Sequence, residues 1–547
     1  MQAPEVLAAN LLKESINPNS PDFKILLYQL QEAVNSPGDL SCLIGPVVKL
    51  LPCHNFQVKK IAYSALPRIC IAHPDAAVLA VNRILLDCRD PNPAVKCLAV
   101  TTLCSLPTLL AEHSGPTLNA ALKDGNPRVR RAAVNGCSKI WKYHPTLLQE
   151  LGFIDRLYES IRDSDPVVVT NSLLVLDMVL AIEGGVVVNR NMAAYLLKRL
   201  GEFPDAQLAT VLQVLGKYIP DNEEELFLEL SILDAYLIHQ TSAAVVVNCI
   251  HLFLLLTEKQ YPHLQTDIIQ RVVPGLQTFL QVPSSKESVI FVLDFLLRMK
   301  IQNKMNWLDA FANYPQLFFP NEREEFKISS KKLQLLPYVC TEDNCEEVLQ
   351  VLRGKYCCNL QTSKEAISCV CLISTRLPIH VGNQCLQVLK LLMDCKEREV
   401  CDNVLHALQD VDLHRYKRKE IQSIVEKVID KVDISQRKLI PNILPVFLGE
   451  FGELIDTLSP YVLETLVSNF ETYKEDGTRN LILLAALKMF LKMPAKCQHI
   501  LGELFEKCIT LNCHGDSPSI ELQNKAQKYF HLLKMDVKLV QKLLMIP

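Results

Sequence analysis

Residues whose types and spacing could support chemistry form a few short groups along this 547-residue chain. The stretch "CHGD" (513–516) places Cys513, His514 and Asp516 close enough to share a metal ion, but the chain offers no second ligand cluster. The acidic runs "EEE" (223–225) and "ERE" (322–324) fit helix N-termini, where carboxylates complement the helix dipole. We therefore expect a loop at 513–516, solvated helix starts at the acidic runs, and no metal site.

Two basic groups, "VKK" and "RVRR", lie where helices are expected to begin, and they contain Lys59, Lys60, Arg128, Arg130 and Arg131. Cations at a helix N-terminus oppose the dipole, at a cost of about a few tenths of a kcal/mol each. Two interpretations are open. The cations could pair with acids of the next structural repeat, or they could contact an anionic surface such as phosphoinositide headgroups or an acidic partner.

The sequence contains none of the motifs that identify common enzymes. A phosphate-binding GxxxxGK[ST], a nucleophile elbow GxSxG, a zinc-binding HExxH and a dinucleotide-binding GxGxxG are all missing. Histidines such as His54, His73, His144 and His263 stand singly beside turns or prolines. We therefore expect neither an enzyme nor a bound cofactor. An enzyme enclosed in a helical shell is the remaining alternative of that class.

Composition argues against nucleic acid as the main partner and indicates a location inside the cell. A formal net charge of −3 and 7% aromatic residues give no electrostatic or stacking basis for binding nucleic acid. The 20 cysteines lie within apolar helical phrases and form no CxxC pair, which is typical of buried free thiols in a reducing compartment. The N-terminus does not read as a secretory signal, and the apolar run at 243–256 is too short to cross a bilayer. We expect a cytosolic protein whose membrane contact is peripheral.

The elements that position these groups come from one repeated phrase. "DPNPAVKCLAVTTLCSLP" (90–107) returns as "DGNPRVRRAAVNGCSKI" (124–140) and "DSDPVVVTNSLLVLDMV" (163–179). Each copy has an N-capping Asn or Asp, then proline at the first helical position, then an apolar stripe. The prolines at 93, 127 and 166 are 34 and 39 residues apart.

Shorter helical segments lie between the copies, so each unit of about 35–40 residues holds two helices. This pattern predicts an all-α, right-handed α-solenoid of HEAT/armadillo-like repeats. A degenerate copy begins near Phe56, and the later copies are weaker. We expect an N-terminal part at 1–312, an irregular joint at 313–337 where three prolines interrupt the rhythm, and a C-terminal part at 338–547.

The repeated phrases also resemble a known family. "PDAAVLAVNRILLDCRDPNPAVKCLAV" (74–100), "EELFLELSILDAYL" (224–237) and "FLGEFGELIDTLSPYVLETLV" (447–467) are similar to the trunk of the large beta subunits of adaptor protein complexes, the adaptins. The resemblance extends along nearly the whole chain. "EGGVVVN" and "PHLQTDIIQRV" are most like the fourth adaptor complex, which works at the trans-Golgi.

The resemblance implies a scaffold subunit of a vesicle-coat adaptor in intracellular protein transport. Such a trunk binds the medium, the small and the second large subunit of a heterotetramer and is recruited by an Arf-type GTPase. The apolar GTPase contacts of related trunks match Val78 and Val81, whose spacing of three lets both side chains share a helix face. The alternative is that both valines belong to the core stripe. The implied location is cytoplasmic and peripheral on Golgi, trans-Golgi or endosomal membranes.

The chain departs from the family pattern in two ways. It stops at Pro547, so the expectation is a trunk without the hinge and ear of many beta subunits. Its first 40 residues contain only Lys13 and Lys24 as basic residues. The competing functional hypothesis is another HEAT-repeat scaffold, such as a nuclear import receptor or a phosphatase scaffold.

Overall fold

The computed structural model describes residues 4–14, 21–35, 40–239, 242–258, 261–281, 285–304, 306–321, 323–395, 397–431, 443–473, 475–510 and 520–544. Every regular element in these ranges is a helix, and none of them is a strand. The predicted all-α class is confirmed. The "CHGD" stretch and Glu322 lie outside the described residues.

The chain divides into two compact units, Met1–Ile268 and Ile269–Pro547. The α-helices that begin in the first unit are α1 (Pro4–Glu14), α2 (Pro21–Asn35), α3 (Ile44–Leu50), α4 (Phe56–Ala72), α5 (Ala76–Asp87), α6 (Pro93–Leu103), α7 (Pro107–Leu122), α8 (Pro127–Tyr143), α9 (Pro145–Glu150), α10 (Phe153–Ser160), α11 (Pro166–Val179), α12 (Arg190–Lys198), α13 (Asp205–Leu215), α14 (Glu223–His239), α15 (Ala243–Thr257) and α16 (His263–Gln281). Short helical turns accompany them at η1 (Ser41–Leu43), η2 (Ala181–Glu183) and η3 (Leu200–Glu202).

The α-helices of the second unit are α17 (Lys286–Ile301), α18 (Asn306–Asp309), α19 (Phe326–Val339), α20 (Cys345–Val351), α21 (Ser363–Arg376), α22 (Ile379–Met393), α23 (Arg398–Ala407), α24 (Arg418–Lys431), α25 (Ile443–Phe451), α26 (Ser459–Ser468), α27 (Asp476–Lys492), α28 (Pro494–Thr510), α29 (Ile520–Met535) and α30 (Val537–Leu543). Its short turns are η4 (Pro315–Phe318), η5 (Leu352–Tyr356), η6 (Leu408–Asp410), η7 (Leu413–Arg415), η8 (Gly452–Ile455) and η9 (Phe470–Thr472), of which η5 is a π-helix.

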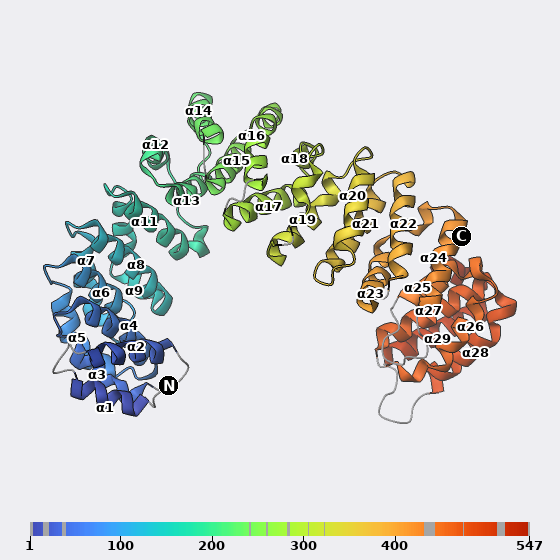
Figure 1. Ribbon diagram of the computed structural model, residues 1–547, viewed down its shortest axis with the longest axis horizontal. Helices are drawn as coiled ribbons and strands as arrows, with labels where there is room; N and C mark the ends of the chain where they lie inside the picture. Colours follow the sequence, from blue (N-terminus) through green and yellow to red (C-terminus); the bar gives the residue numbers. More distant parts are fainter. Residues whose placement is uncertain are drawn as a thin grey trace. The chain divides into compact units, whose positions relative to one another are not determined.

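Helices of the first unit stack in sequence order. One row runs α4, α6, α8, α11, α13 and α15, each helix packed on the next, and α5 and α7 pack beside this row against α6 (Figure 1). In the second unit α17, α19, α21 and α23 form a corresponding row, and α20, α22 and α24 form its neighbour. Each helix pair therefore covers the apolar face of the pair before it, as in a HEAT-type α-solenoid.

The repeated phrase produces the same local structure each time. Pro93, Pro127 and Pro166 begin α6, α8 and α11, as predicted. Before each proline a side-chain oxygen caps the helix: Asn92 Oδ1 accepts from Ala94 N at 3.0 Å, and Asn126 Oδ1 accepts from Arg128 N at 2.9 Å. The phrase therefore marks the start of one helix in each of these repeats.

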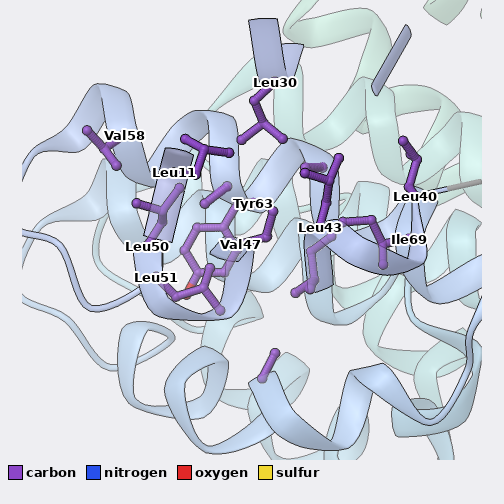
Figure 2. Packing of buried hydrophobic residues seen from close by; sticks show 14 of the residues in the cluster. Leu11, Leu30, Leu40, Leu43, Val47, Leu50, Leu51, Val58, Tyr63 and Ile69 are labelled. Carbon is purple, nitrogen blue, oxygen red and sulfur yellow. The ribbon is translucent and has the colours of Figure 1, made fainter. Parts of the chain in front are cut away.

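The first helices enclose an apolar core. Figure 2 shows Leu11, Leu30, Leu43, Val47 and Tyr63 gathered in it, all essentially without solvent contact. Burying a leucine or valine side chain contributes roughly 1.5–3 kcal/mol. This packing, rather than intrinsic propensity, holds such short helices in place.

Small residues mark the places where helices approach closely. Ala99, Ala133 and Ser172 occupy equivalent positions in α6, α8 and α11, and all three are fully buried. At Gly136 of α8, an added Cβ would lie 2.7 Å from the Sγ of Cys104. The recurring small residues of the sequence therefore serve helix–helix packing.

Two other segments of the sequence have defined places. The apolar run at 243–256 forms α15, which is largely buried. Among the described residues, no helix is long and apolar enough to span a membrane. The joint proposed at 313–337 contains η4 and most of α19, and α19 packs on α17 and α21. Its role as a joint stays a prediction.

Candidate partner-binding surface

The helix α5 presents one face to the core and the other to solvent. Ala77, Ala80 and Ile84 are fully buried, because their spacing of three and four residues keeps them on one side of the helix. Val78, Leu79 and Leu86 lie on the opposite side and are exposed by 62%, 65% and 63%. We call these three residues the α5 apolar patch. Three large aliphatic side chains left in water on one helix are typical of a protein-binding surface.

The two valines predicted as GTPase contacts are in different environments. Val78 belongs to the α5 apolar patch, whereas Val81 is half-buried and packs against the hydrophobic core. Sequence reasoning missed Leu79 and Leu86. They could have been found by following the helical period from Val78, since Leu86 is two turns from Leu79 and both fall opposite the buried alanines.

A buried ionic network fixes the last turn of α5 to α4. The carboxylate of Asp87, 1% exposed, accepts hydrogen bonds from Lys59 Nζ at 2.7 Å, Tyr63 Oη at 2.7 Å and Arg83 Nη2 at 2.6 Å. Burial, together with the hydrogen bond to Asp87, raises the pKa of the Tyr63 hydroxyl, so Tyr63 remains a donor. The α5 apolar patch is therefore carried on a helix whose C-terminal end is rigidly held.

Three of the five predicted basic residues pair with acids of a later element. Lys59 pairs with Asp87 as above. Arg130 makes two parallel bonds to Asp163, at 2.7 and 2.8 Å, and Arg131 binds Asp165 at 2.6 Å. The interpretation as an ion-pair ladder between repeats describes Arg130 and Arg131, whereas Lys59 joins the two helices of its own repeat.

The ladder has a member that sequence reasoning did not identify. Lys96 of α6 binds Asp124 at 2.7 Å, with the same spacing of 28 residues as Lys59 and Asp87. By contrast, Lys60 and Arg128 are exposed and have no acidic partner among the described residues. Those two side chains are the ones available to an anionic surface.

The acidic side chains of the two runs form ion pairs and hydrogen bonds within the fold. Glu223 and Glu225 lie in the first turn of α14, where Glu225 pairs with Arg190 and Glu223 accepts a hydrogen bond from Tyr261. Glu324 pairs with the buried Lys332 at 2.6 Å. Within the described ranges, no group of three or more His, Cys, Asp or Glu residues could hold a metal ion.

A second exposed apolar strip lies in the first unit. Leu174 and Met178 are one turn apart on the solvent side of α11, and Ile182 in η2 is 92% exposed. Val187 in the following loop is also exposed. The unit therefore offers apolar surface at more than one place along its helices.

The chain matches a family model and several curated proteins. The model for the adaptin N terminal region covers residues 24–537. The chain is 30% identical to the AP-4 complex subunit beta-1 of Mus musculus over 513 residues, covering 93% of this chain and 67% of the relative. It is 25% identical to the AP-1 complex subunit beta-1 of Mus musculus, covering 91% and 52%, and 26% identical to the beta-adaptin-like protein A of Arabidopsis thaliana, covering 97% and 63%. The chain thus spans about half to two thirds of the length of these relatives.

Solved structures with the same fold belong to more than one class of protein. A chain in the homology model of the full-length AP-3 complex in an intermediate open conformation has 15% identity and a TM-score of 0.50, covering 98% of this chain and 93% of that one. The karyopherin Kap121p, bound to the SUMO protease Ulp1p, has 11% identity and a TM-score of 0.51, covering 93% and 60%. These likenesses confirm the solenoid but do not separate an adaptor from an import receptor.

The sequence matches distinguish an adaptor subunit from an import receptor. The curated relatives are subunits of adaptor complexes, which are structural proteins, and this kinship confirms the prediction that the chain is not an enzyme. It also favours the adaptor interpretation over the import receptor and the phosphatase scaffold. Because the adaptin model matches residues 24–537, the chain belongs to the adaptin family, as a large beta-type subunit of an adaptor complex.

Proposed function

We propose that the chain is the scaffold of a heterotetrameric vesicle adaptor in intracellular protein transport, binding a medium, a small and a second large subunit along its stacked helices. The family match supports this proposal, because the relatives are named as subunits of complexes. The exposed apolar surface on α11 and η2 supports it as well, since obligate subunit interfaces are large and apolar. The chain then works through its shape and its surfaces.

Subunit binding is tested by affinity purification of the tagged chain from cells, followed by mass spectrometry. The expected result is recovery of the other three subunits of one adaptor type. Co-expression with the medium subunit should also raise the yield of soluble chain. Recovery of a Ran-type GTPase or a phosphatase catalytic subunit in place of adaptor subunits would refute the proposal.

Recruitment to membranes is assigned to α5. An Arf-type GTPase would bind the α5 apolar patch, with Val78 as the central contact and Val81 at its edge. The observation that carries this assignment is the 62% exposure of Val78 on a helix anchored by the buried Asp87 network. A rigid apolar surface loses little conformational entropy on binding, which favours affinity.

The test uses the assembled complex and a GTP-loaded Arf-type GTPase on immobilised beads. Val78→Asp places a charge in the apolar contact and should reduce binding at least about tenfold, equivalent to about 1.4 kcal/mol. Ile219→Asp is the matched control, because Ile219 is similarly exposed, at 55%, but lies in the loop after α13. Unchanged binding of Val78→Asp, or equal loss in the control, would remove α5 from the mechanism.

The membrane served is proposed to be the trans-Golgi or an endosome, with the chain cytoplasmic and peripheral. The support is the similarity to the AP-4 complex subunit beta-1. The exposed Lys60 and Arg128 would add contact with anionic lipid, whereas Lys59, Arg130 and Arg131 are occupied by acids. Microscopy of a tagged chain against compartment markers tests the location. Vesicle flotation of a Lys60→Glu, Arg128→Glu variant tests the lipid contact.

A further inference from the structure

The last helices of the second unit enclose a small apolar pocket. The helix α28 packs on both α27 and α29, and α29 packs on α30 (Figure 1). These helices surround a cavity of about 210 Å³ that is open to solvent. We call it the α28–α30 pocket, and its lining includes Leu501, Gly502, Phe505, Phe530, Lys534 and Val537.

The floor of the α28–α30 pocket is aliphatic and aromatic. Leu501 and Phe505 of α28 are buried, and the ring of Phe505 lies edge to face with that of Phe530 of α29, with 5.5 Å between the ring centroids. Val537, the first residue of α30, is exposed at the edge of the pocket. An apolar cavity of about 150 Å³ holds a benzene molecule, so this pocket has room for one phenyl ring. Aromatic walls suit such a ring, because aromatic side chains pair favourably edge to face.

Gly502 keeps the pocket open. This residue lies within α28 and is exposed, and a Cβ added to it would meet no other atom within 4 Å. Its φ is not positive, so neither close packing nor backbone conformation requires a glycine here. Glycine is also unfavourable inside a helix. Because Gly502 lines the pocket, a larger side chain at this position would occupy the space that a ligand could use.

Lys534 places a positive charge at the rim of the pocket. Its side chain is exposed, and its Nζ lies 4.4 Å from the centroid of the Phe530 ring. Lys525 of the same helix pairs with Glu521, whereas Lys534 forms no ion pair with any acid among the residues that the structure describes. The next acid along the chain, Asp536, accepts a hydrogen bond from the backbone N of Lys538. A carboxylate beside the pocket would therefore complement Lys534.

We propose that the α28–α30 pocket binds a short linear segment of a partner protein in which a phenylalanine is followed by acidic residues. The phenyl ring enters the cavity against Phe505 and Phe530, and a carboxylate of the segment pairs with Lys534. A linear segment is the fitting occupant, because a pocket for one side chain is far smaller than the surface that a folded subunit buries. Binding through one apolar anchor and one exposed ion pair is weak and readily reversible.

The probe is a fluorescein-labelled peptide, GSGFEEGSG, which is titrated with the purified full-length chain and followed by fluorescence anisotropy. We expect saturable binding. The peptide GSGAEEGSG should bind at least about tenfold more weakly, because burying an apolar ring contributes more than the free energy of a tenfold change. The charge-reversed peptide GSGFKKGSG should bind roughly threefold more weakly, or less still, since it replaces the attraction to Lys534 with repulsion.

Two variants test the pocket itself. Gly502→Leu fills the cavity and should abolish binding of GSGFEEGSG, while the fold is kept because leucine favours the helix and the added side chain meets open space. Gly275→Leu is its matched control, since Gly275 of α16 is equally open but lies outside the pocket. Lys534→Glu should reverse the preference between GSGFEEGSG and GSGFKKGSG. Lys528→Glu, at an exposed lysine of the same helix that does not line the pocket, should leave that preference unchanged.

Three results would overturn the proposal. The first is no binding of GSGFEEGSG at millimolar concentrations of the peptide. The second is equal binding of the phenylalanine and alanine peptides, or unchanged binding by a Gly502→Leu chain whose circular dichroism and unfolding temperature match the wild type. The third is a dimer of the wild-type chain in sedimentation that Gly502→Leu abolishes, because the pocket would then hold a second copy of this chain.

Discussion

The two units join neighbouring repeats with ion pairs of opposite direction. From α4 to α11 the cation belongs to the earlier helix and the acid to a later element, as in Lys96–Asp124 and Arg130–Asp163, both at 2.7 Å. In the second unit the cation usually belongs to the later helix, as in Lys427–Asp394 at 2.5 Å and Lys496–Asp456 at 2.6 Å. The exposed pair Lys286–Glu325 is an exception there, and Lys217–Asp177 is an exception in the first unit.

The acids of the first type also shape the loop. Asp124 Oδ1 accepts from Asn126 N at 2.8 Å, and Asp163 Oδ1 accepts from Asp165 N at 2.8 Å. These backbone hydrogen bonds hold each carboxylate in one orientation. The carboxylate side chain therefore loses less conformational entropy when it pairs with its cation. Burial raises the pKa of Asp124, but hydrogen bonds from Lys96 and Asn126 outweigh it, so the pKa lies below its usual value.

The cations of the second type also cap helices. Lys427 Nζ donates to the carbonyl of Lys390 at 3.2 Å, and Lys496 Nζ donates to that of Asp456, directly after η8, at 3.3 Å. A cation near the C-terminal end of a helix complements its dipole and satisfies a free carbonyl. The comparison teaches that one stacked fold can link its repeats through acids held by loops or through cations held by helix ends.

The largest expected effect comes from the buried member of the first type. Asp87→Ala leaves Lys59, 4% exposed, without its counter-charge and Tyr63 without its acceptor. We expect a loss of about 3–5 kcal/mol from the first unit, because an uncompensated charge stays buried. Hydrogen exchange of the backbone amides of α4, α5 and α6 measures this loss of stability locally. The double variant Lys59→Met, Asp87→Leu should recover part of the loss, and no recovery would contradict a buried ion pair.

A buried acid outside the ion-pair ladder should give the next largest effect on stability. Glu229 of α14 is 2% exposed, and its Oε2 has no hydrogen-bond partner among the described residues. Burial, and then Glu225, raises its pKa to about 7. The folded chain binds this proton where the unfolded chain does not, so stability falls as pH rises from about 4.5 to about 7.

Glu229→Gln removes this dependence and should stabilise the first unit at pH 8 by about 3 kcal/mol. Asp124 and Asp165 have the opposite sign, because their pKa values are lowered in the fold. Their stabilisation is present at neutral pH and is lost as pH falls below about 4. Thermal unfolding between pH 3 and pH 8 distinguishes the contribution of Glu229 to stability from that of Asp124 and Asp165. An unchanged profile in Glu229→Gln would exclude Glu229 as the source.

Arg130 and Asp163 should show an intermediate coupling. Both side chains are mostly buried and share two hydrogen bonds, so a double-mutant cycle with Arg130→Ala and Asp163→Ala should give about 1–2 kcal/mol. The measurement is local hydrogen exchange in α8 and α11. A coupling near zero would mean that the loop bonds of Asp163, and not the cation, hold the repeats together.

The smallest effect is expected for a pair of the second type. Lys427 and Asp394 are both substantially exposed, so the same cycle should give about 0.5 kcal/mol and should weaken in high salt. Lys427→Ala alone should cost somewhat more than Asp394→Ala, since Lys427 also caps the carbonyl of Lys390. A coupling as large as that of Arg130 and Asp163 would remove the distinction between the two types.

Local sequence determined where the helices of the clearest repeats begin. The starts at Pro93, Pro127 and Pro166 were predictable because capping and the fixed φ of proline act within four residues. The buried small residues, Ala99 and Ala133, followed from the same periodicity. The family resemblance carried the assignment where the repeats weaken and their local signals fade.

Tertiary structure alone decided which charges are neutralised and which apolar residues are left in water. Lys59 and Lys60 are adjacent in sequence, yet only Lys59 reaches Asp87, because the stacking of α4 on α5 determines what lies 28 residues away. The exposure of Leu79 depends in the same way on which helices pack against α5. Hydrogen bonds within one turn are encoded in a short segment, but pairing across repeats requires the packed stack.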